Sequence, residues 1–166
     1  MSPVYKTVGG LTGTLPSDRE IRFTRSFNAP AQMVFDAHTQ PDLIKRWLLG
    51  PEGWTMPVCE VDLRVGGGYR YTWRKSADGS EFSLGGTYRE IEAPHRIVHT
   101  ERFEPDWTGG EAVCTFTLQD RDGVTDMTLT VLYPSQQIRD GALQTGMMDG
   151  MEASYERLDR MEGQIN

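Results

Sequence analysis

The chain of 166 residues carries a formal net charge of −7 from 24 acidic and 17 basic residues, and 37% of its residues are hydrophobic and 25% charged. This composition excludes a disordered or collagen-like chain, and the length fits one domain with a sizeable core. The acidic balance and the lack of a Lys/Arg cluster argue against a nucleic-acid partner, and no apolar run reaches the roughly 18 residues of a membrane span, so we expect no membrane insertion.

Residues 1–18 are rich in Gly, Thr and Pro and show weak periodicity. They predict an extended arm or a short extra strand before one domain over residues 19–166. The start of the chain lacks the basic segment and apolar block of a signal peptide, so we expect a cytoplasmic protein with Cys59 and Cys114 as free thiols. The stretch VYKTV in the arm would allow strand pairing with a second copy, which leaves a homodimer open.

The first clear pattern is IRFTRSF, in which Ile21, Phe23, Arg25 and Phe27 alternate onto one face of a predicted strand. A helix is predicted from NAPAQMVFDAHT, since Asn28 and Pro30 signal a helix start. A second short helix follows at PDLIKRW, with its proline in the first turn, where proline is favoured.

The middle of the chain predicts six strands that short turns connect, which is typical of an antiparallel meander. The last segment predicts one long amphipathic helix from Ser135, a plausible N-cap, to about Glu162. The fold class is therefore α+β, a curved antiparallel sheet of about seven strands on a long C-terminal helix, with two short helices between the first two strands. The six predicted strands are Thr55–Leu63, Tyr69–Lys75, Glu81–Ile91, Arg96–Phe103, Ala112–Gln119 and Thr125–Tyr133.

The predicted last helix has an apolar face rich in methionine, made of Leu143, Met147, Met151, Tyr155 and Leu158. Such a face is typical of core packing, but methionine also suits the wall of a cavity that adapts to its ligand. Aromatic residues on neighbouring strands favour the cavity. The opposite face, predicted to meet solvent, holds Asp149, Glu152, Glu156 and Arg160. The predicted cavity residues are Trp47 and Trp54 near the mouth and Tyr71, Trp73, Phe116, Met147, Met151 and Tyr155 in the lining.

The chain offers few candidates for chemistry. The glycines at 66–68 lack the Gly-Lys-Ser/Thr of a phosphate loop, and His95 and His99 are roughly 13 Å apart by strand rise, too far for one metal. We expect no metal and no cofactor. If the strands turn them inward, Arg25, His99 and Glu101 would bring charge into an apolar interior. They form either a structural ion pair, or bulged positions facing outward, or a polar anchor for a ligand.

Three stretches carry a family resemblance: AHTQPDLIKRWLLGPEGW, CEVDLRVGGGYRYTWRKSADGSEF and GGTYREIEAPHRIVHTERF. Together they resemble the family named for the activator of the heat-shock-protein-90 ATPase, in its C-terminal-domain-like branch, over roughly residues 20–163. The family belongs to the START-like, birch-pollen-allergen-like superfamily (SRPBCC). The resemblance implies the helix-grip fold, and it implies a cavity under the last helix that binds hydrophobic or amphipathic molecules, lipids among them.

These observations favour a binding module for a small hydrophobic or aromatic-bearing ligand, without catalysis. The alternative is an enzyme of cyclase or hydrolase type acting on a polyketide-like substrate in the same cavity. His99 and Glu101 would then be the acid–base pair, since they lie two apart on one strand face. Activation of a chaperone ATPase is less favoured, because the founding activator has a separate chaperone-binding domain where this chain has the arm.

Overall fold

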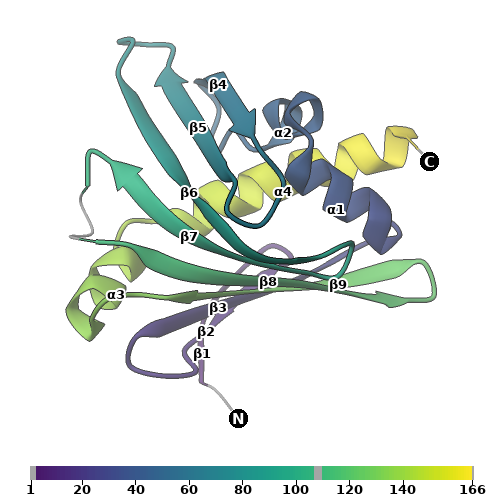
Figure 1. Cartoon of the computed structure of the whole chain (residues 1–166), viewed down its shortest axis with the longest axis horizontal. Helices are drawn as coiled ribbons and strands as arrows, with labels where there is room; N and C mark the ends of the chain where they lie inside the picture. The colour runs from purple at the N-terminus through teal and green to yellow at the C-terminus, as the bar shows by residue number, and fades with distance from the viewer. Residues whose placement is uncertain (1–2, 107–109, 166) are drawn as a thin grey trace.

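The structure, a computed structural model, describes residues 3–106 and 110–165. Nine strands in this part of the chain form one antiparallel sheet in the order β1-β2-β3-β9-β8-β7-β6-β5-β4. The sheet curves around the last helix (Figure 1), which confirms the predicted α+β class and architecture. The strands are Val4–Val8 (β1), Leu11–Thr14 (β2), Glu20–Phe27 (β3), Trp54–Val61 (β4), Gly68–Lys75 (β5), Glu81–Glu92 (β6), Arg96–Glu104 (β7), Ala112–Arg121 (β8) and Val124–Leu132 (β9).

The two strands beyond the predicted seven or so come from the N-terminal segment. β1 and β2 form a hairpin, and β2 pairs with β3 along the edge of the sheet. Gly9 makes the hairpin turn with a φ of +56°, which a glycine adopts without strain. β1 is mostly exposed and β2 has only four residues, so neither strand shows enough alternation to be recognised from the sequence.

Two short helices, α1 (Ala31–Thr39) and α2 (Pro41–Trp47), lie between β3 and β4 as predicted. The first turn of α1 is capped from outside the helix, because Asp120 accepts a 2.7 Å hydrogen bond from the Ala31 N–H. The helix pair packs beside the last helix and the end of the sheet (Figure 1). It therefore forms one end of the space that the sheet encloses.

The prediction of one long C-terminal helix is wrong, because the segment forms two helices. They are α3 (Gln136–Leu143) and α4 (Met147–Ile165). Ser135 caps α3 as predicted, since its hydroxyl accepts a 3.2 Å hydrogen bond from the Ile138 N–H. The break lies at Gly146, whose φ of +75° is in the left-handed region that ends helices.

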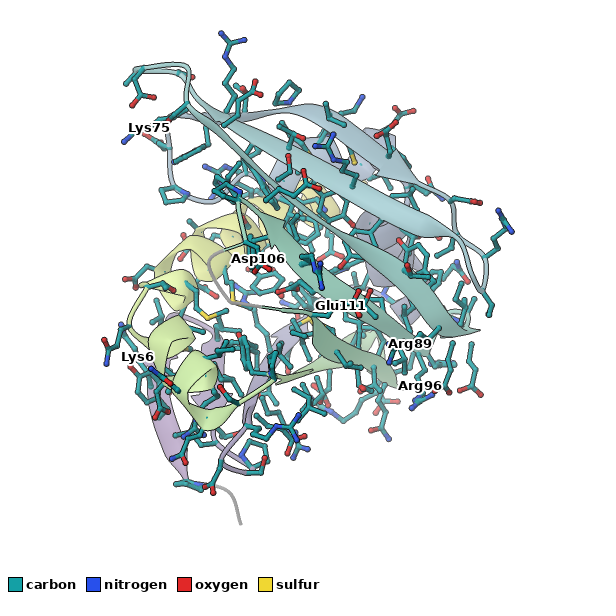
Figure 2. All side chains as sticks on the ribbon, turned by 60° about the vertical axis from the view of Figure 1, so that its left-hand side comes forward. Lys6, Lys75, Arg89, Arg96, Asp106 and Glu111 are labelled. Atoms are coloured by element: carbon teal, nitrogen blue, oxygen red, sulfur yellow. The ribbon has the colours of Figure 1, made fainter. Side chains whose placement is uncertain are left out.

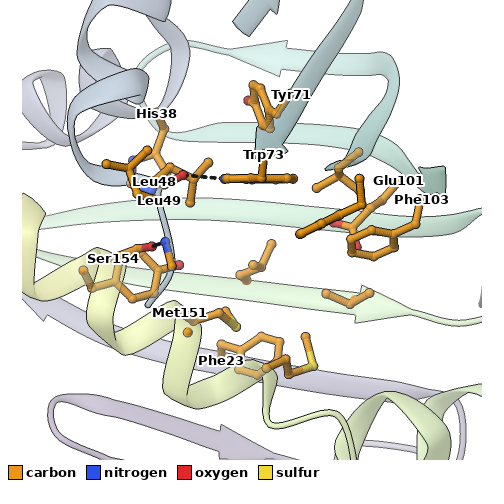
Figure 3. Close-up of a pocket in the computed structure, with 18 of the residues that line it drawn as sticks. Phe23, His38, Leu48, Leu49, Tyr71, Trp73, Glu101, Phe103, Met151 and Ser154 are labelled. Carbon is orange, nitrogen blue, oxygen red and sulfur yellow. Dashed lines mark hydrogen bonds between the residues drawn. The ribbon is translucent and has the colours of Figure 1, made fainter. Parts of the chain in front are cut away.

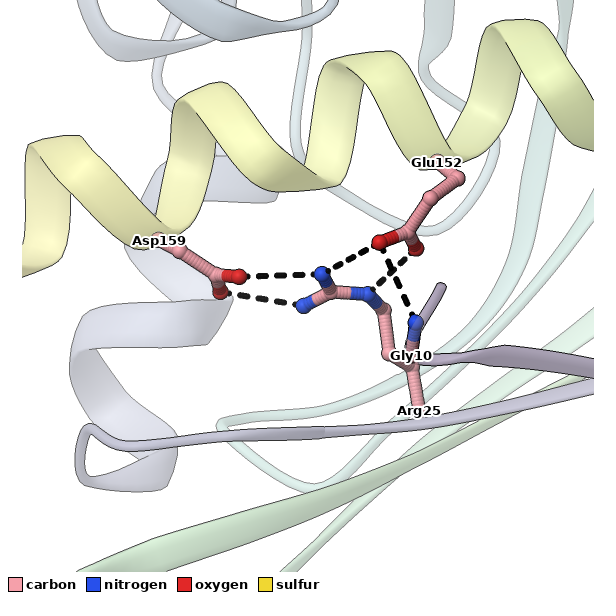
Figure 4. A network of polar contacts seen from close by, with 4 residues as sticks. All are labelled: Gly10, Arg25, Glu152 and Asp159. Carbon is pink, nitrogen blue, oxygen red and sulfur yellow. Dashed lines mark hydrogen bonds and ion pairs between the residues drawn. The ribbon is translucent and has the colours of Figure 1, made fainter. Parts of the chain in front are cut away.

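A buried ion-pair network fastens α4 to the sheet (Figure 4). Arg25 of β3 donates from Nε to Glu152 Oε1 over 2.8 Å and from Nη2 to Glu152 Oε2 over 2.9 Å. The same guanidinium donates to both carboxylate oxygens of Asp159, two helical turns further along α4, over 3.0 and 2.9 Å. The Gly10 N–H also reaches Glu152, over 3.2 Å. The network thus joins α4, β3 and the turn of the β1–β2 hairpin.

The prediction that Glu152 faces solvent is therefore wrong, since Glu152 is only 4% exposed. Burial by itself would raise the pKa of Glu152, but hydrogen bonds from Arg25 and Gly10 outweigh this effect and lower the pKa. Desolvation likewise opposes the charge on Arg25, and the two carboxylates outweigh it and raise the Arg25 pKa. Both groups are held in their charged forms.

The hydrophobic core follows the concave side of the sheet. Ile21, Phe23 and Phe27 of β3 are buried there with Leu158 of α4. Charged side chains such as Lys6, Lys75 and Arg89 project from the outer surface (Figure 2). The core is not filled along its whole length, and the unfilled part is the candidate site.

Candidate functional site

A cavity of about 840 Å³ lies between the sheet and α4 (Figure 3). This volume falls within the range of about 300–1,000 Å³ that is typical of small-molecule sites. Strands β5 to β9 supply one wall and α4 the facing wall, while the α2–β4 loop and the α3–α4 turn border the rest. Its aromatic lining consists of Phe23, Trp47, Trp54, Tyr69, Tyr71, Trp73, Phe82, Tyr88, Phe103, Phe116, Tyr133 and Tyr155.

Nearly all the predicted site residues line this cavity. Arg25 is the one predicted site residue that does not line it. The residues that do are Trp47, Trp54, Tyr71, Trp73, His99, Glu101, Phe116, Met147, Met151 and Tyr155. The Arg25 guanidinium is instead enclosed by Glu152 and Asp159, as in the structural ion pair that the sequence left open. The inward orientation of His99 and Glu101 rules out the outward-facing bulge for these two residues. That the lining residues bind a ligand stays a prediction.

Hydrogen bonds fix the α2–β4 loop against the rest of the wall. The Gly50 N–H donates to Ser154 Oγ of α4 over 2.8 Å, and Trp73 Nε1 of β5 donates to the Leu48 carbonyl over 2.8 Å (Figure 3). Arg157 of α4 donates to the Gly50 carbonyl. The loop therefore bridges helix and sheet at the edge of the cavity.

Gly150 of α4 faces this loop. A Cβ atom at Gly150 would lie 3.6 Å from the Pro51 ring, which is ordinary van der Waals contact, so the position of the loop does not require a glycine. Pro51, Gly150 and the turn residues Thr145 and Gly146 all border the cavity. The glycines that weaken the predicted helix thus lie where α4 meets the loop and the cavity.

His99 presents a hydrogen-bond acceptor to the cavity. Tyr69 donates its hydroxyl proton to the Thr100 carbonyl over 2.6 Å, so the 3.1 Å contact between Tyr69 Oη and His99 Nδ1 requires the proton on Nδ1. Burial lowers the pKa of His99, which favours the neutral ring. Its Nε2 atom is then an acceptor, and it has no hydrogen-bond partner in the described part of the chain.

Glu101 is a carboxyl group in aromatic surroundings. Its neighbour Cys114 donates from Sγ to Glu101 Oε2 over 3.5 Å, and no Lys or Arg of residues 3–106 and 110–165 forms an ion pair with it. Burial raises the Glu101 pKa, and the thiol contact opposes this only in part. Burial likewise raises the pKa of Cys114, so the thiol keeps its proton. A carboxyl group without a cation inside a cavity is typical of functional sites.

Other polar atoms of the lining also lack partners. His38 donates from Nδ1 to the Val34 carbonyl over 2.7 Å, while its buried Nε2 has no partner in the described chain. Burial lowers the pKa of His38 to about 4, so the ring is neutral. The hydroxyls of Tyr71 and Tyr155 make no hydrogen bond with any described residue, and burial raises both pKa values.

Residues 3–106 and 110–165 hold no group of three His, Cys, Asp or Glu side chains placed to bind a metal ion. In the same ranges, no helix combines the length and the apolar character needed to cross a bilayer.

Sequence reasoning missed His38, Phe82 and Phe103 as lining residues, and it missed the partners of Arg25. Phe82 and Phe103 were detectable, because the alternation of their strands puts them on the side of Leu84 and Glu101. The pairing of Glu152 with Arg25 had no local signal, since the two residues are 127 positions apart.

A curved antiparallel sheet that grips a C-terminal helix over a ligand-sized cavity defines a helix-grip domain. Residues 28–162 match the family described as "Activator of Hsp90 ATPase homolog 1-like protein". The chain belongs to this family. A comparison with curated proteins gives no match.

Solved structures support the same fold. A crystal structure of a protein from Rhodobacter sphaeroides is similar with a TM-score of 0.85 and 31% identity, covering 91% of this chain and 97% of that one. A protein from Chromobacterium violaceum has a TM-score of 0.76 and 27% identity over 88% of this chain and 98% of its own. An HSP90 activator from Plasmodium falciparum has a TM-score of 0.57 and 20% identity over 81% and 91%, a likeness of fold alone.

Proposed function

We propose that this protein binds a small hydrophobic or amphipathic molecule in the cavity between the sheet and α4. The observation that carries the proposal is a cavity of about 840 Å³ lined mostly by apolar and aromatic side chains between the sheet and α4. Protein interiors normally leave few voids larger than a water molecule. Leu49, Leu129 and Met151 are only half-buried although they lie within the fold, because they face this space.

The composition of the α4 wall supports a ligand over an unfilled core. Met147 and Met151 are flexible and polarizable, so they adapt to an apolar surface of varied shape. Gly146 and Gly150 remove side-chain volume from the same wall. The opposite wall is aromatic and rigid, and it presents single polar atoms such as His99 Nε2, which is the usual balance in small-molecule sites.

The first experiment is native mass spectrometry of the purified protein, followed by denaturing extraction. We expect a co-purified molecule of apolar or amphipathic character at one per chain. The blocked variant Leu129→Phe places a ring between Phe23 and Phe116, its neighbours on the adjacent strands, and should lose most of the bound molecule. Thr117→Phe adds the same ring to the other face of β8 and should retain it.

Weakly held molecules wash away, so a titration accompanies the mass measurement. Trp47, Trp54 and Trp73 line the cavity, and their fluorescence should change when an uncharged apolar probe such as N-phenyl-1-naphthylamine enters. Stoichiometric binding that Leu129→Phe abolishes supports the proposal. Equal binding by wild type and both variants, or no binding by any of them, contradicts it.

A second candidate is chemistry on the bound molecule, favoured by one observation. His99 and Glu101 line the same cavity, and burial lowers the pKa of the first and raises that of the second. Paired groups whose pKa values are shifted in this way can act as base and acid. Conversion of the extracted molecule by wild type, lost in His99→Gln but not in Thr117→Phe, would establish catalysis. Recovery of the unchanged molecule supports binding alone.

A further inference from the structure

Charge inside the cavity is of one sign. The described residues that line it include two acidic side chains, Glu101 and Asp149, and no Lys or Arg. Asp149 is exposed, in the first turn of α4, whereas Glu101 lies within the cavity. A positively charged molecule would therefore meet a favourable potential both outside and inside, in a protein whose net charge is −7.

The groups around Glu101 are neutral. Burial raises the pKa values of Tyr69, Tyr71, Tyr133 and Cys114, and the nearby Glu101 charge adds to this effect, so each group keeps its proton at neutral pH. Cys114 supplies the one side-chain hydrogen bond that Glu101 accepts from residues 3–106 and 110–165. Burial raises the Glu101 pKa and so favours the neutral acid when no cation is near. An ammonium group beside Glu101 would lower this pKa again and hold the carboxylate, and no cation of the described chain forms an ion pair with Glu101.

Aromatic rings surround the approach to Glu101. The Trp73 and Phe82 rings are stacked with centroids 5.0 Å apart, and the Phe82 and Phe103 centroids lie 6.3 Å apart. Phe103 lies beside Glu101 in Figure 3, while His38 and the leucines of the α2–β4 loop occupy the other end. Ring faces attract organic cations within about 6 Å of their centroids. A carboxylate next to such rings is a favourable site for an ammonium group.

We infer that the ligand of this cavity is an organic amine, with its ammonium group at Glu101 and its apolar body extending toward Leu48, Leu49 and Met151. This inference rests on the proposed function and assigns the chemical class of its ligand. Glu101 supplies the counter-charge and Trp73, Phe82 and Phe103 supply the aromatic surroundings. The methionines of α4 contact the apolar body.

The test compares three probes that share one ring system and differ in charge: 2-(1-naphthyl)ethylamine, 2-(1-naphthyl)ethanol and 1-naphthylacetate. Calorimetric titrations at pH 7 would measure each Kd for wild type, Glu101→Gln and Glu60→Gln. Glu101→Gln keeps the shape of the side chain and removes its charge. Glu60→Gln removes a charge from the exposed face of β4 and is the matched control.

We expect wild type and Glu60→Gln to bind the amine about tenfold or more tightly than the alcohol, and the acid least tightly. In Glu101→Gln the amine should lose this preference to within about twofold, while the alcohol binds as before. A buried pair is weakly screened, so 0.5 M NaCl should leave most of the preference in place. If Glu101→Gln does not fold, Glu101→Met tests the same point with an apolar side chain.

Binding of the uncharged alcohol tests the ligand-binding cavity by itself, whereas the preference for the amine over the alcohol tests the role of Glu101. Equal binding of all three probes, or an amine preference that Glu101→Gln retains, overturns the assignment of an amine and leaves a ligand-binding cavity in place. If wild type binds none of the probes, the alcohol included, both the proposed function and this inference are overturned.

Discussion

Replacement of Arg25 by methionine should destabilise the protein by several kcal/mol. Arg25 makes four hydrogen bonds to Glu152 and Asp159, and the Arg25 and Glu152 side chains are each only 5% exposed. Methionine fills much of the same space but leaves the Glu152 carboxylate buried with only the Gly10 N–H. The loss of one partner from a buried ion pair costs about 3–5 kcal/mol.

Asp159 is expected to contribute much less than Glu152. Its side chain is 44% exposed, so its carboxylate regains water when Arg25 is removed. Asp159→Asn should therefore cost about 1 kcal/mol or less, the range of an exposed ion pair. Arg22→Met, on the same strand with one side-chain hydrogen bond to Thr130, is the matched control and should also cost about 1 kcal/mol.

Urea denaturation followed by circular dichroism would measure these changes as free energies of unfolding. For a chain of this length, a loss of 3–5 kcal/mol corresponds to a fall in Tm of about 10 °C. The double variant Arg25→Met with Glu152→Leu should recover most of the loss, because apolar pairs often replace buried ion pairs without cost. A loss below 1 kcal/mol for Arg25→Met, or no recovery in the double variant, would refute this reasoning.

Three further outcomes are expected. Glu162 of α4 is buried without a hydrogen-bond partner in the described chain, and burial, reinforced by the Asp159 charge, raises its pKa from 4.5 to about 7. The stability that the protonated Glu162 contributes is therefore full below pH 4.5 and lost as pH rises through 7. Urea denaturation would measure the free energy of unfolding at pH 5 and pH 9. Between these two pH values, wild type should lose about 1–2 kcal/mol more than Glu162→Gln, which is less than the full pKa shift implies because solvent screens part of it. A parallel pH dependence of the two proteins would contradict this. Gly141→Ala, in the interior of α3 with open space around its Cβ, should raise stability by about 0.5–1 kcal/mol, whereas Gly146→Ala should lower it by about 1 kcal/mol because of the left-handed φ. Thermal melts would compare the two variants, and the same sign for both would contradict the helix break at Gly146. Gly86→Ala should yield little folded protein on expression, since its Cβ would coincide with the Thr100 carbonyl oxygen; a melt within a few degrees of wild type would refute that close approach.

The cavity-lining strands were predictable because their alternation is local. Tyr71 and Trp73 lie two apart on β5, and the pleat places both on the concave side whatever else the chain does. The same reasoning failed for Glu152, because a helical projection assumes that the face opposite the apolar stripe meets water. In this fold the sheet curves around α4, and β3 with the β1–β2 hairpin covers the part of the opposite face that holds Glu152, while Asp149, Glu156 and Arg160 are exposed. Such coverage depends on contacts more than a hundred residues apart, which no local pattern contains.

Tyr155 shows why the two faces of α4 depend on each other. Its ring lies 5.5 Å from the Arg25 guanidinium and 5.5 Å from the Phe27 ring, and it also lines the cavity with Trp47. A helix beside a void has lost packing contacts on that face, so its position has to be fixed from elsewhere. The charged network at Glu152 and Asp159 fixes it from the opposite face. The Met-rich first turns of α4 can then border an open cavity. A helix held by apolar contacts alone would require a close-packed partner on that face.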